Sequence, residues 1–147
     1  MKKYIQLILS AGLMLSGLLS FATTYTWTGG TSTAWNTTSN WSPAGVPGTG
    51  DFVHIYSGTY HPVLPGKKTI DGLFMHSGTL DLNGDTLLLN SGTSTFSGGT
   101  ISNGWVQMRG TEMTFNTTTF NVPIDAVVNR INLNGCTFNN YCYFETV

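Results

Sequence analysis

Residues 77–104 read SGTLDLNGDTLLLNSGTSTFSGGTISNG, and this stretch decides the fold because its turn residues recur at a fixed distance. The Ser-Gly-Thr of residues 77–79 repeats residues 57–59, and Asn83-Gly84 recurs as Asn103-Gly104 at the same interval. This interval matches one coil of a β-solenoid, which takes on the order of 20 residues and stacks its strands on the coil below. Glycine and asparagine suit the corners of such coils because both tolerate positive φ.

Short apolar segments between these turns are predicted to be strands, and the clearest of them alternate in period two, as Val53 and Ile55 do with their neighbours. The candidates are residues 52–56, 73–75, 80–82, 87–89, 105–108, 113–115, 131–133 and 138–144. Residues 125–130 are too short for more than a turn of helix. We therefore predict an all-β chain with a β-solenoid, or parallel β-helix, of about five coils over residues 51–147. A β-sandwich is the alternative, because its short strands also recur at regular intervals with turns between them.

Residues 23–50 differ in composition from the coils and are predicted to form an N-terminal cap. They hold Trp27, Trp35 and Trp41 and end in a loop rich in proline and glycine. One interpretation is that the tryptophans pack together as a plug over the first coil, which a solenoid needs at its end. The other is a carbohydrate-binding platform, because aromatic faces stack on the C–H surfaces of sugar rings. The sequence leaves both open and favours the plug.

This opening resembles a known kind of protein. The segments that carry the resemblance are YTWTGG (residues 25–30), AWN (34–36), NWS (40–42), GVPG (45–48) and GDFVHI (50–55). They look like the N-terminal region of large exported bacterial β-solenoid surface proteins, autotransporter-like or adhesin-like, of the kind exported with a C-terminal sorting domain. The resemblance implies a Trp-rich cap followed by solenoid coils. It implies no particular activity, because such stems carry adhesins, polysaccharide-degrading enzymes and other proteins.

Proteins of this kind usually run to many hundreds of residues and end in an anchoring or sorting module. Here the sequence stops at Val147, straight after an apolar run at residues 141–144. An uncapped solenoid end exposes strand edges that invite association. We therefore expect either a truncated solenoid or self-association with a partner at the open C-terminal end.

Residues 1–22 have the three parts of a secretory signal peptide. Lys2 and Lys3 precede an apolar run at residues 5–19, and Ala22 closes a small-residue cleavage site. The run is interrupted by polar residues and is shorter than the ~20 residues that span a bilayer. We expect cleavage near Thr23, no membrane span in the mature chain, and a secreted or cell-surface protein.

Charge excludes one class of partner. Loss of Lys2 and Lys3 with the signal peptide changes the formal net charge from −1 to −3. The remaining basic residues are Lys67, Lys68, Arg109 and Arg130. Nucleic-acid binding requires a concentrated basic patch, so we do not expect nucleic acid as a partner.

The residues that could carry chemistry form no recognisable site. His54, His61 and His76 have spacings that match no metal motif. The acidic residues include Asp51 and Asp71, which the coil repeat would stack in one column without an evident third partner. We predict no catalytic residues, no metal and no cofactor.

Cys136 and Cys142 are the only cysteines. In an oxidising compartment they could form a disulfide, or they could remain two free buried thiols, and the sequence does not decide between these states. The threonines, including those at 117–119, are not spaced regularly enough to predict one per coil at a constant position.

The sequence as a whole predicts a non-catalytic exported module, adhesin-like, that contacts a glycan or cell-surface ligand through an extended face. The alternatives are a fragment of a polysaccharide-active β-helix enzyme and a small secreted carbohydrate-binding module that uses Trp27, Trp35 and Trp41. Turnover of an acidic polysaccharide would favour the first alternative, and tryptophan-dependent sugar binding without turnover would favour the second.

Overall fold

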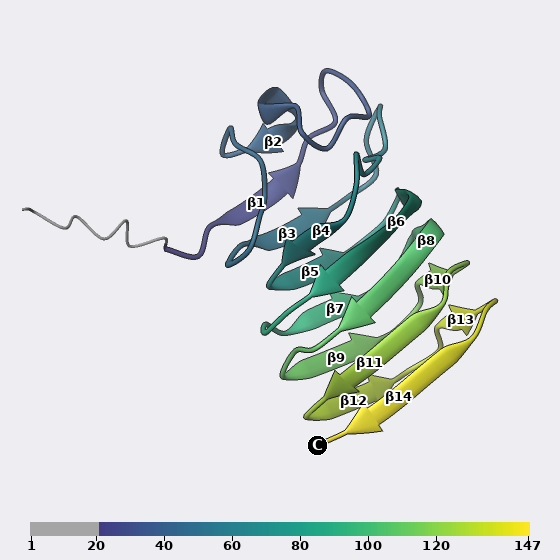
Figure 1. Ribbon diagram of the computed structural model, residues 1–147. Helices are drawn as coiled ribbons and strands as arrows, with labels where there is room; N and C mark the ends of the chain where they lie inside the picture. Colours follow the sequence, from purple (N-terminus) through teal and green to yellow (C-terminus); the bar gives the residue numbers. More distant parts are fainter. Residues whose placement is uncertain (1–20) are drawn as a thin grey trace, which may run out of the picture.

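The computed structural model describes residues 21–147, so the predicted signal peptide lies almost wholly outside the described residues. The described chain is all-β and forms a β-solenoid of about five turns, with 50% of its residues in strands and 2% in helix. Figure 1 shows the coils stacked one below another, from the N-terminal cap to the C-terminal strand. This confirms the predicted fold class, and the sandwich alternative is wrong.

One face of the solenoid is a seven-stranded sheet in the order β12-β9-β7-β5-β3-β1-β2. Neighbouring strands are parallel except β1 and β2, which are antiparallel. The strands are β1 (Thr24–Trp27), β2 (Trp41–Ser42), β3 (Phe52–Ile55), β5 (Gly72–Met75), β7 (Ser94–Phe96), β9 (Glu112–Phe115) and β12 (Arg130–Leu133); a short 3-10 helix, η1 (Thr38–Asn40), precedes β2. Parallel pairing between consecutive coils is what a solenoid requires and a sandwich of hairpins lacks.

The second sheet contains two long strands that pass around a bend. β6 (Thr79–Leu89) and β8 (Thr100–Met108) each contribute to two rows, because Asn83 and Asn103 have positive φ values of 53° and 58° in mid-strand. The parts of β6 and β8 before the bend form one row of parallel strands with β10 (Thr119–Phe120) and β13 (Thr137–Phe138). The parts after the bend form a second row, in the order β4 (Lys68–Ile70), β6, β8, β11 (Ile124–Val128) and β14 (Cys142–Thr146).

Paired positions confirm the predicted coil length and show that it varies. Phe52 pairs with Gly72, Phe74 with Thr95, and Glu112 with Arg130. The coil at Phe74 is one residue longer than the coil at Phe52, and the coil at Glu112 is two residues shorter. The first coil is the longest of these, since Thr24 pairs with Phe52, and its extra residues build the cap.

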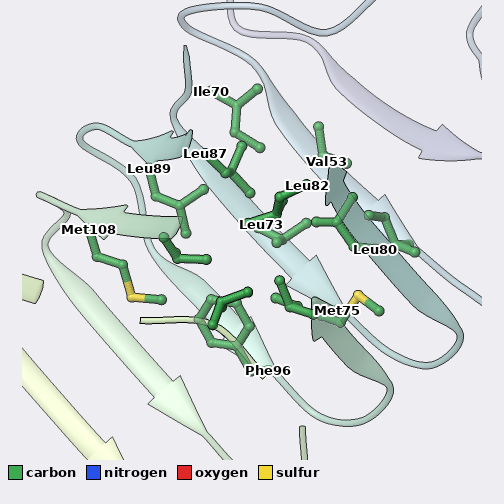
Figure 2. Close-up of a cluster of buried hydrophobic side chains, with 14 of the residues drawn as sticks. Val53, Ile70, Leu73, Met75, Leu80, Leu82, Leu87, Leu89, Phe96 and Met108 are labelled. Atoms are coloured by element: carbon green, nitrogen blue, oxygen red, sulfur yellow. The ribbon is translucent and has the colours of Figure 1, made fainter. Parts of the chain in front are cut away.

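The core is a narrow apolar strip enclosed by the rows of strands (Figure 2). Every second residue of each strand points inward, so one coil supplies Val53 and Ile55 where the next supplies Leu73 and Met75, all with no exposed surface. Toward the C-terminal end the strip becomes aromatic. Its rings belong to Phe96, Phe115, Phe120, Phe138 and Phe144. Burial of these side chains is the main favourable term for stacking one coil on another.

Two of the predicted elements are wrong in detail. At residues 125–130 the sequence predicts at most a turn of helix, but β11 (Ile124–Val128) is a strand. Its Ile124, Ala126 and Val128 are buried in period two while its backbone pairs with β8 and β14. Residues 138–144 are not one strand, because the corner at residues 139–141 separates β13 from β14.

Glycines stand where consecutive coils approach at their corners, and Gly99 gives the first testable prediction. Its φ is +80°, and a Cβ there would lie 2.6 Å from the Gly78 carbonyl oxygen and 2.7 Å from Met75 Cε. We expect Gly99→Ala to lower the free energy of unfolding in urea by roughly 1–3 kcal/mol, because strain and a backbone clash act together. Gly48→Ala is the matched control, since a Cβ on Gly48 meets no atom within 4 Å. Equal stability of the two variants would contradict the packing described for this corner.

Candidate functional sites

The three tryptophans of the cap lie in the interior. Trp27 and Trp41 are 3% exposed and Trp35 is 0% exposed. The Trp41 ring meets the rings of Trp27 and Trp35 edge to face, with centroids 4.8 and 4.6 Å away. Edge-to-face contact is a favourable arrangement of aromatic rings. The structure thus packs the three residues together at the N-terminal end of the core.

Hydrogen bonds fix two of these three indoles in place. Trp27 Nε1 donates to the Tyr60 carbonyl oxygen at 2.8 Å, and Trp41 Nε1 donates to the Trp35 carbonyl oxygen at 2.7 Å. Asn40, also buried, accepts from the backbone N–H groups of Thr31 and Ser32. No indole face is left open to a sugar ring, so this geometry gives no support to a carbohydrate platform at Trp27, Trp35 and Trp41. It favours the plug.

The two cysteines are free thiols in the structure, each half-buried beside the aromatic end of the core. Partial burial raises the pKa of both thiols, and for Cys136 a backbone hydrogen bond with Thr118 opposes that rise in pKa. A thiol with a raised pKa is mostly protonated at neutral pH and therefore poorly nucleophilic. The predicted alternative of a Cys136–Cys142 disulfide is not what the structure contains.

The acidic residues considered for catalysis hold turns. Asp51 accepts hydrogen bonds from the backbone N–H groups of Thr23 and Gly48, at 3.1 and 2.9 Å. Asp71 lies at the neighbouring position of the next coil, where its carboxylate accepts from Gly50 N–H and Ser91 Oγ. The two aspartates are stacked by the coil repeat as expected, and each carboxylate accepts a hydrogen bond from a neighbouring coil.

A group of stacked aromatic and imidazole rings covers the outer surface of β3 and β5. His54 stacks on Phe74 with ring centroids 4.5 Å apart, and Tyr56 stacks on His76 at 4.3 Å. The interplanar angles are 15° and 2°. The rings thus partly cover one another across the two coils, while Tyr56 remains 45% exposed.

His54 and His76 also form a direct nitrogen–nitrogen contact. His54 Nδ1 lies 3.0 Å from His76 Nε2, and the ring centroids are 5.2 Å apart. The distance between the ring centroids is longer than the nitrogen–nitrogen distance by about two ring radii. The two nitrogens therefore lie on the line between the centroids, and the rings meet edge to edge through one N–H···N hydrogen bond. Such a bond needs one donor and one acceptor, and it is lost when both rings are protonated. Within residues 21–147, no group of three or more histidine, cysteine or acidic residues is placed to hold a metal ion.

This pair predicts a loss of stability in mild acid. Burial, and secondarily the charge of His76, lower the pKa of His54 below its ordinary value of 6.5. The folded chain then binds this proton less readily than the unfolded chain. The pair's contribution to the free energy of unfolding is therefore complete above pH 6.5 and declines as the pH falls below that value. We expect the Tm to fall between pH 7.5 and 5.5, and to fall less in His54→Phe.

The outer neighbours of the pair simplify this measurement. In the same two columns, the adjacent coils carry Thr26, Thr95 and Ser97, none of which titrates in this range. His61→Gln is the control, because His61 lies outside the His54–His76 contact and contacts the Thr79 backbone N–H instead. An equal acid response in the wild type and in His54→Phe would show that other groups cause it.

A column of threonines lies on the outer surface of the row before the bend. Thr79 pairs with Thr100, Thr100 with Thr119, and Thr119 with Thr137. The expectation that no threonine position recurs in each coil is therefore wrong. The next outward positions of the same strands are Asp81, Ser102, Asn121 and Asn139. Within the described residues, the four threonine hydroxyls make no hydrogen bond to the protein and remain available to a ligand.

Exposed aromatic residues occupy the row after the bend. Trp105 on β8 is 44% exposed, Tyr141 beside β14 is 63% exposed, and Tyr143 on β14 is 43% exposed. No sequence pattern marks Trp105, because it stands apart from the tryptophan cluster of the cap. Burial distinguishes it, since the other three tryptophans are enclosed.

Comparison with known proteins identifies no relative. No protein family, no curated protein and no solved structure matches this chain. Residues 21–147 also contain no pocket, and no helix among them is long and apolar enough to cross a membrane. The outer columns and the ring cluster are therefore the features from which a function has to be argued.

Proposed function

We propose that this chain is an exported, non-catalytic β-solenoid module that contacts an extended ligand through an outer face, as an adhesin-like surface protein would. The observation that carries the proposal is the threonine column at Thr79, Thr100, Thr119 and Thr137. It places the same hydroxyl chemistry on four successive coils, at the strand spacing of about 4.8 Å. A ligand with its own repeat can use all four rungs together.

Repetition favours this mechanism over a single strong contact. Each exposed hydroxyl contributes little by itself, since a net hydrogen bond is worth about 1 kcal/mol. When contacts are linked on one rigid surface, each further contact is effectively intramolecular, and the affinities combine. Stacked coils supply that rigidity, because each strand is held by the strands above and below it.

A polysaccharide-active enzyme fragment is the rival interpretation. It needs carboxylates free to act as acid and base on a bound substrate. Asp51 and Asp71 accept hydrogen bonds from backbone N–H groups of the preceding coil, and Asp125 is bound to Arg109 at 2.6 Å. These contacts give the rival no positive support, and the experiment below tests for turnover directly.

The test measures binding and turnover together. The mature chain is immobilised and exposed to xylan, a β-glucan, polygalacturonate and collagen, each as a polymer and as a short fragment. We expect at least one polymer to bind roughly a hundredfold more tightly than its fragment without release of products. Thr100→Lys and Thr119→Lys, which place bulky side chains in mid-column, should weaken that binding, whereas Thr95→Lys on β7, in the other sheet, should not.

Three results would overturn the proposal. They are release of new chain ends from a polysaccharide, affinity that does not depend on ligand length, and no binding to any member of the panel. A circular dichroism melt of each variant would show that the lysine substitutions leave the fold intact.

A further inference from the structure

Trp105, Pro123 and Tyr141 occupy one outer column across three successive coils. Val106 pairs with Ile124, and Ile124 with Cys142, so the preceding residue of each strand falls in line. The backbone bonds confirm the alignment: Val106 N–H donates to the Pro123 carbonyl oxygen and Ile124 N–H to the Tyr141 carbonyl oxygen, both at 3.0 Å. The corresponding position of the coil above holds Thr86. The column is thus polar at one end and ring-bearing over three coils.

The large rings of this column are partly exposed to solvent. Among residues 21–147, no aromatic ring packs on Trp105, Tyr141 or Tyr143, in contrast to the stacked rings of β3 and β5. Exposing 44% of a tryptophan and 63% of a tyrosine to water is unfavourable unless something covers them. Tryptophan and tyrosine with open faces are the residues on which flat, partly apolar ligands stack.

The spacing of the rings describes the ligand's shape. Trp105 and Tyr141 are two coils apart, about 9.6 Å along the solenoid axis, and Tyr143 lies two residues farther along its strand, about 6.6 Å away. A ligand in contact with Trp105 and Tyr141 must therefore be extended along the axis. A chain of pyranose rings is long enough, and each of its rings offers C–H faces for stacking and hydroxyl groups at its edge.

The polar residues beside the rings describe the ligand's charge. Arg109 is neutralised by Asp125, through a 2.6 Å ion pair and a 2.9 Å bond to the Asp125 carbonyl oxygen. Tyr143 donates its hydroxyl to Glu145 at 2.8 Å, and this hydrogen bond and the charge of Glu145 raise the phenol's pKa. Around the rings, this surface therefore offers no free cation to a polyanion and only one carboxylate to a polycation; the exposed Lys67 lies farther along the column, beyond Thr86. It fits an uncharged ligand rich in hydroxyl groups.

We propose that the surface of Trp105, Pro123, Tyr141 and Tyr143 binds an extended, uncharged polysaccharide. This inference rests on the proposed function and names its ligand class and a second binding surface. The sugar rings stack on Trp105 and Tyr141, and their hydroxyl groups donate to Glu145 and accept from the remaining amide and hydroxyl groups of the row. Proline at position 123 keeps the middle of the surface flat and apolar.

Intrinsic fluorescence tests the proposal directly, because Trp105 is the one exposed tryptophan in the described chain and the other three give a constant background. The mature protein is titrated with the uncharged hexasaccharides cellohexaose, xylohexaose and laminarihexaose, with their disaccharides, and with polygalacturonate. We expect a blue shift with at least one hexasaccharide and an affinity at least tenfold above that of its disaccharide, which cannot reach from Trp105 to Tyr141. Polygalacturonate should bind at least tenfold more weakly.

Variants identify the surface. Trp105→Thr introduces the residue type that Thr86 already provides at this position of the neighbouring coil, so the strand is retained and the fluorescence response should disappear. Tyr141→Thr, measured by calorimetry and by Trp105 fluorescence, should lower hexasaccharide affinity about tenfold. Tyr60→Thr is the control, because Tyr60 is 41% exposed but lies outside this column. The hexasaccharide affinity of this variant should equal that of the wild type.

The proposal is overturned if no uncharged hexasaccharide binds, if Tyr141→Thr binds as tightly as wild type, or if polygalacturonate binds equally well. These results are separable from failure of the proposed function. Length-dependent polymer binding that is lost in Thr100→Lys but kept in Trp105→Thr would leave the extended-face module standing and remove only this surface and its ligand.

Discussion

Replacing Trp35 by alanine is expected to lower the free energy of unfolding by about 3–5 kcal/mol, the range for a large aromatic side chain removed from a core. Trp35 is fully buried and packs against the Trp41 ring, so the surrounding residues cannot close the space without moving the cap. Urea denaturation followed by circular dichroism measures the effect. A tryptophan that served as a surface platform would instead be replaceable at little cost.

Two further variants sharpen this prediction. Trp35→Phe should lower the free energy of unfolding by less than the lost volume alone suggests. The Trp35 indole N–H is buried and has no hydrogen-bond partner within the described chain, so its removal also removes an unfavourable buried polar group. Trp105→Ala is the matched control, since it removes an exposed tryptophan and should change stability by less than about 1 kcal/mol. A Trp35→Ala variant as stable as Trp105→Ala would mean that the cap does not stabilise the solenoid.

Replacing Phe115 by alanine is expected to have a comparable effect, about 3–5 kcal/mol, for a different reason. The Phe115 ring has Phe96 on one side, at 5.0 Å, and Phe138 and Phe144 on the other, both at 5.6 Å. It therefore links the middle coils to the last one. In a stack where each coil contacts only its neighbours, loss of such a link acts locally.

Hydrogen exchange should reveal this local effect. In Phe115→Ala we expect the amides of β11, β12 and β14 to lose protection more than those of β3 and β5, which lie nearer the N-terminal end of the stack. Met113→Ala, at a buried neighbouring position of the same strand, gives a volume change without removing a ring. A uniform loss of protection across all coils in Phe115→Ala would show that the described chain unfolds as one cooperative unit.

The sequence is informative wherever one residue type marks one structural role. The Asn83 and Asn103 corners, the alternating strand at residues 52–55 and the Trp-rich opening all occur where the sequence predicts them. Local patterns of this kind are readable because positive φ and period-two burial are properties of single residues and single strands. β11 is not predicted, although four of its five residues are apolar, because its strand conformation depends on pairing with β8 and β14.

The surface features are harder to predict because they depend on register between coils. The intervals between Thr79, Thr100, Thr119 and Thr137 shorten from one coil to the next, so a search at a constant period misaligns them. His54 and His76 meet diagonally across two coils, and neither has a local motif. Trp105 and Tyr141 become neighbours on one surface only when the coil steps between them have been counted correctly.

The bend in β6 suggests how such a chain changes over evolution. Three residues between Asp81 and Asp85 face a single residue, Asn103, between Ser102 and Gly104, yet the pairing is in register on both sides. An insertion or deletion at this corner is thus absorbed within one bend and leaves the outer columns aligned. Descendants of one ancestral coil can differ in length and still present the same surface, so kinship among such chains should be sought in aligned columns and not in a fixed repeat length.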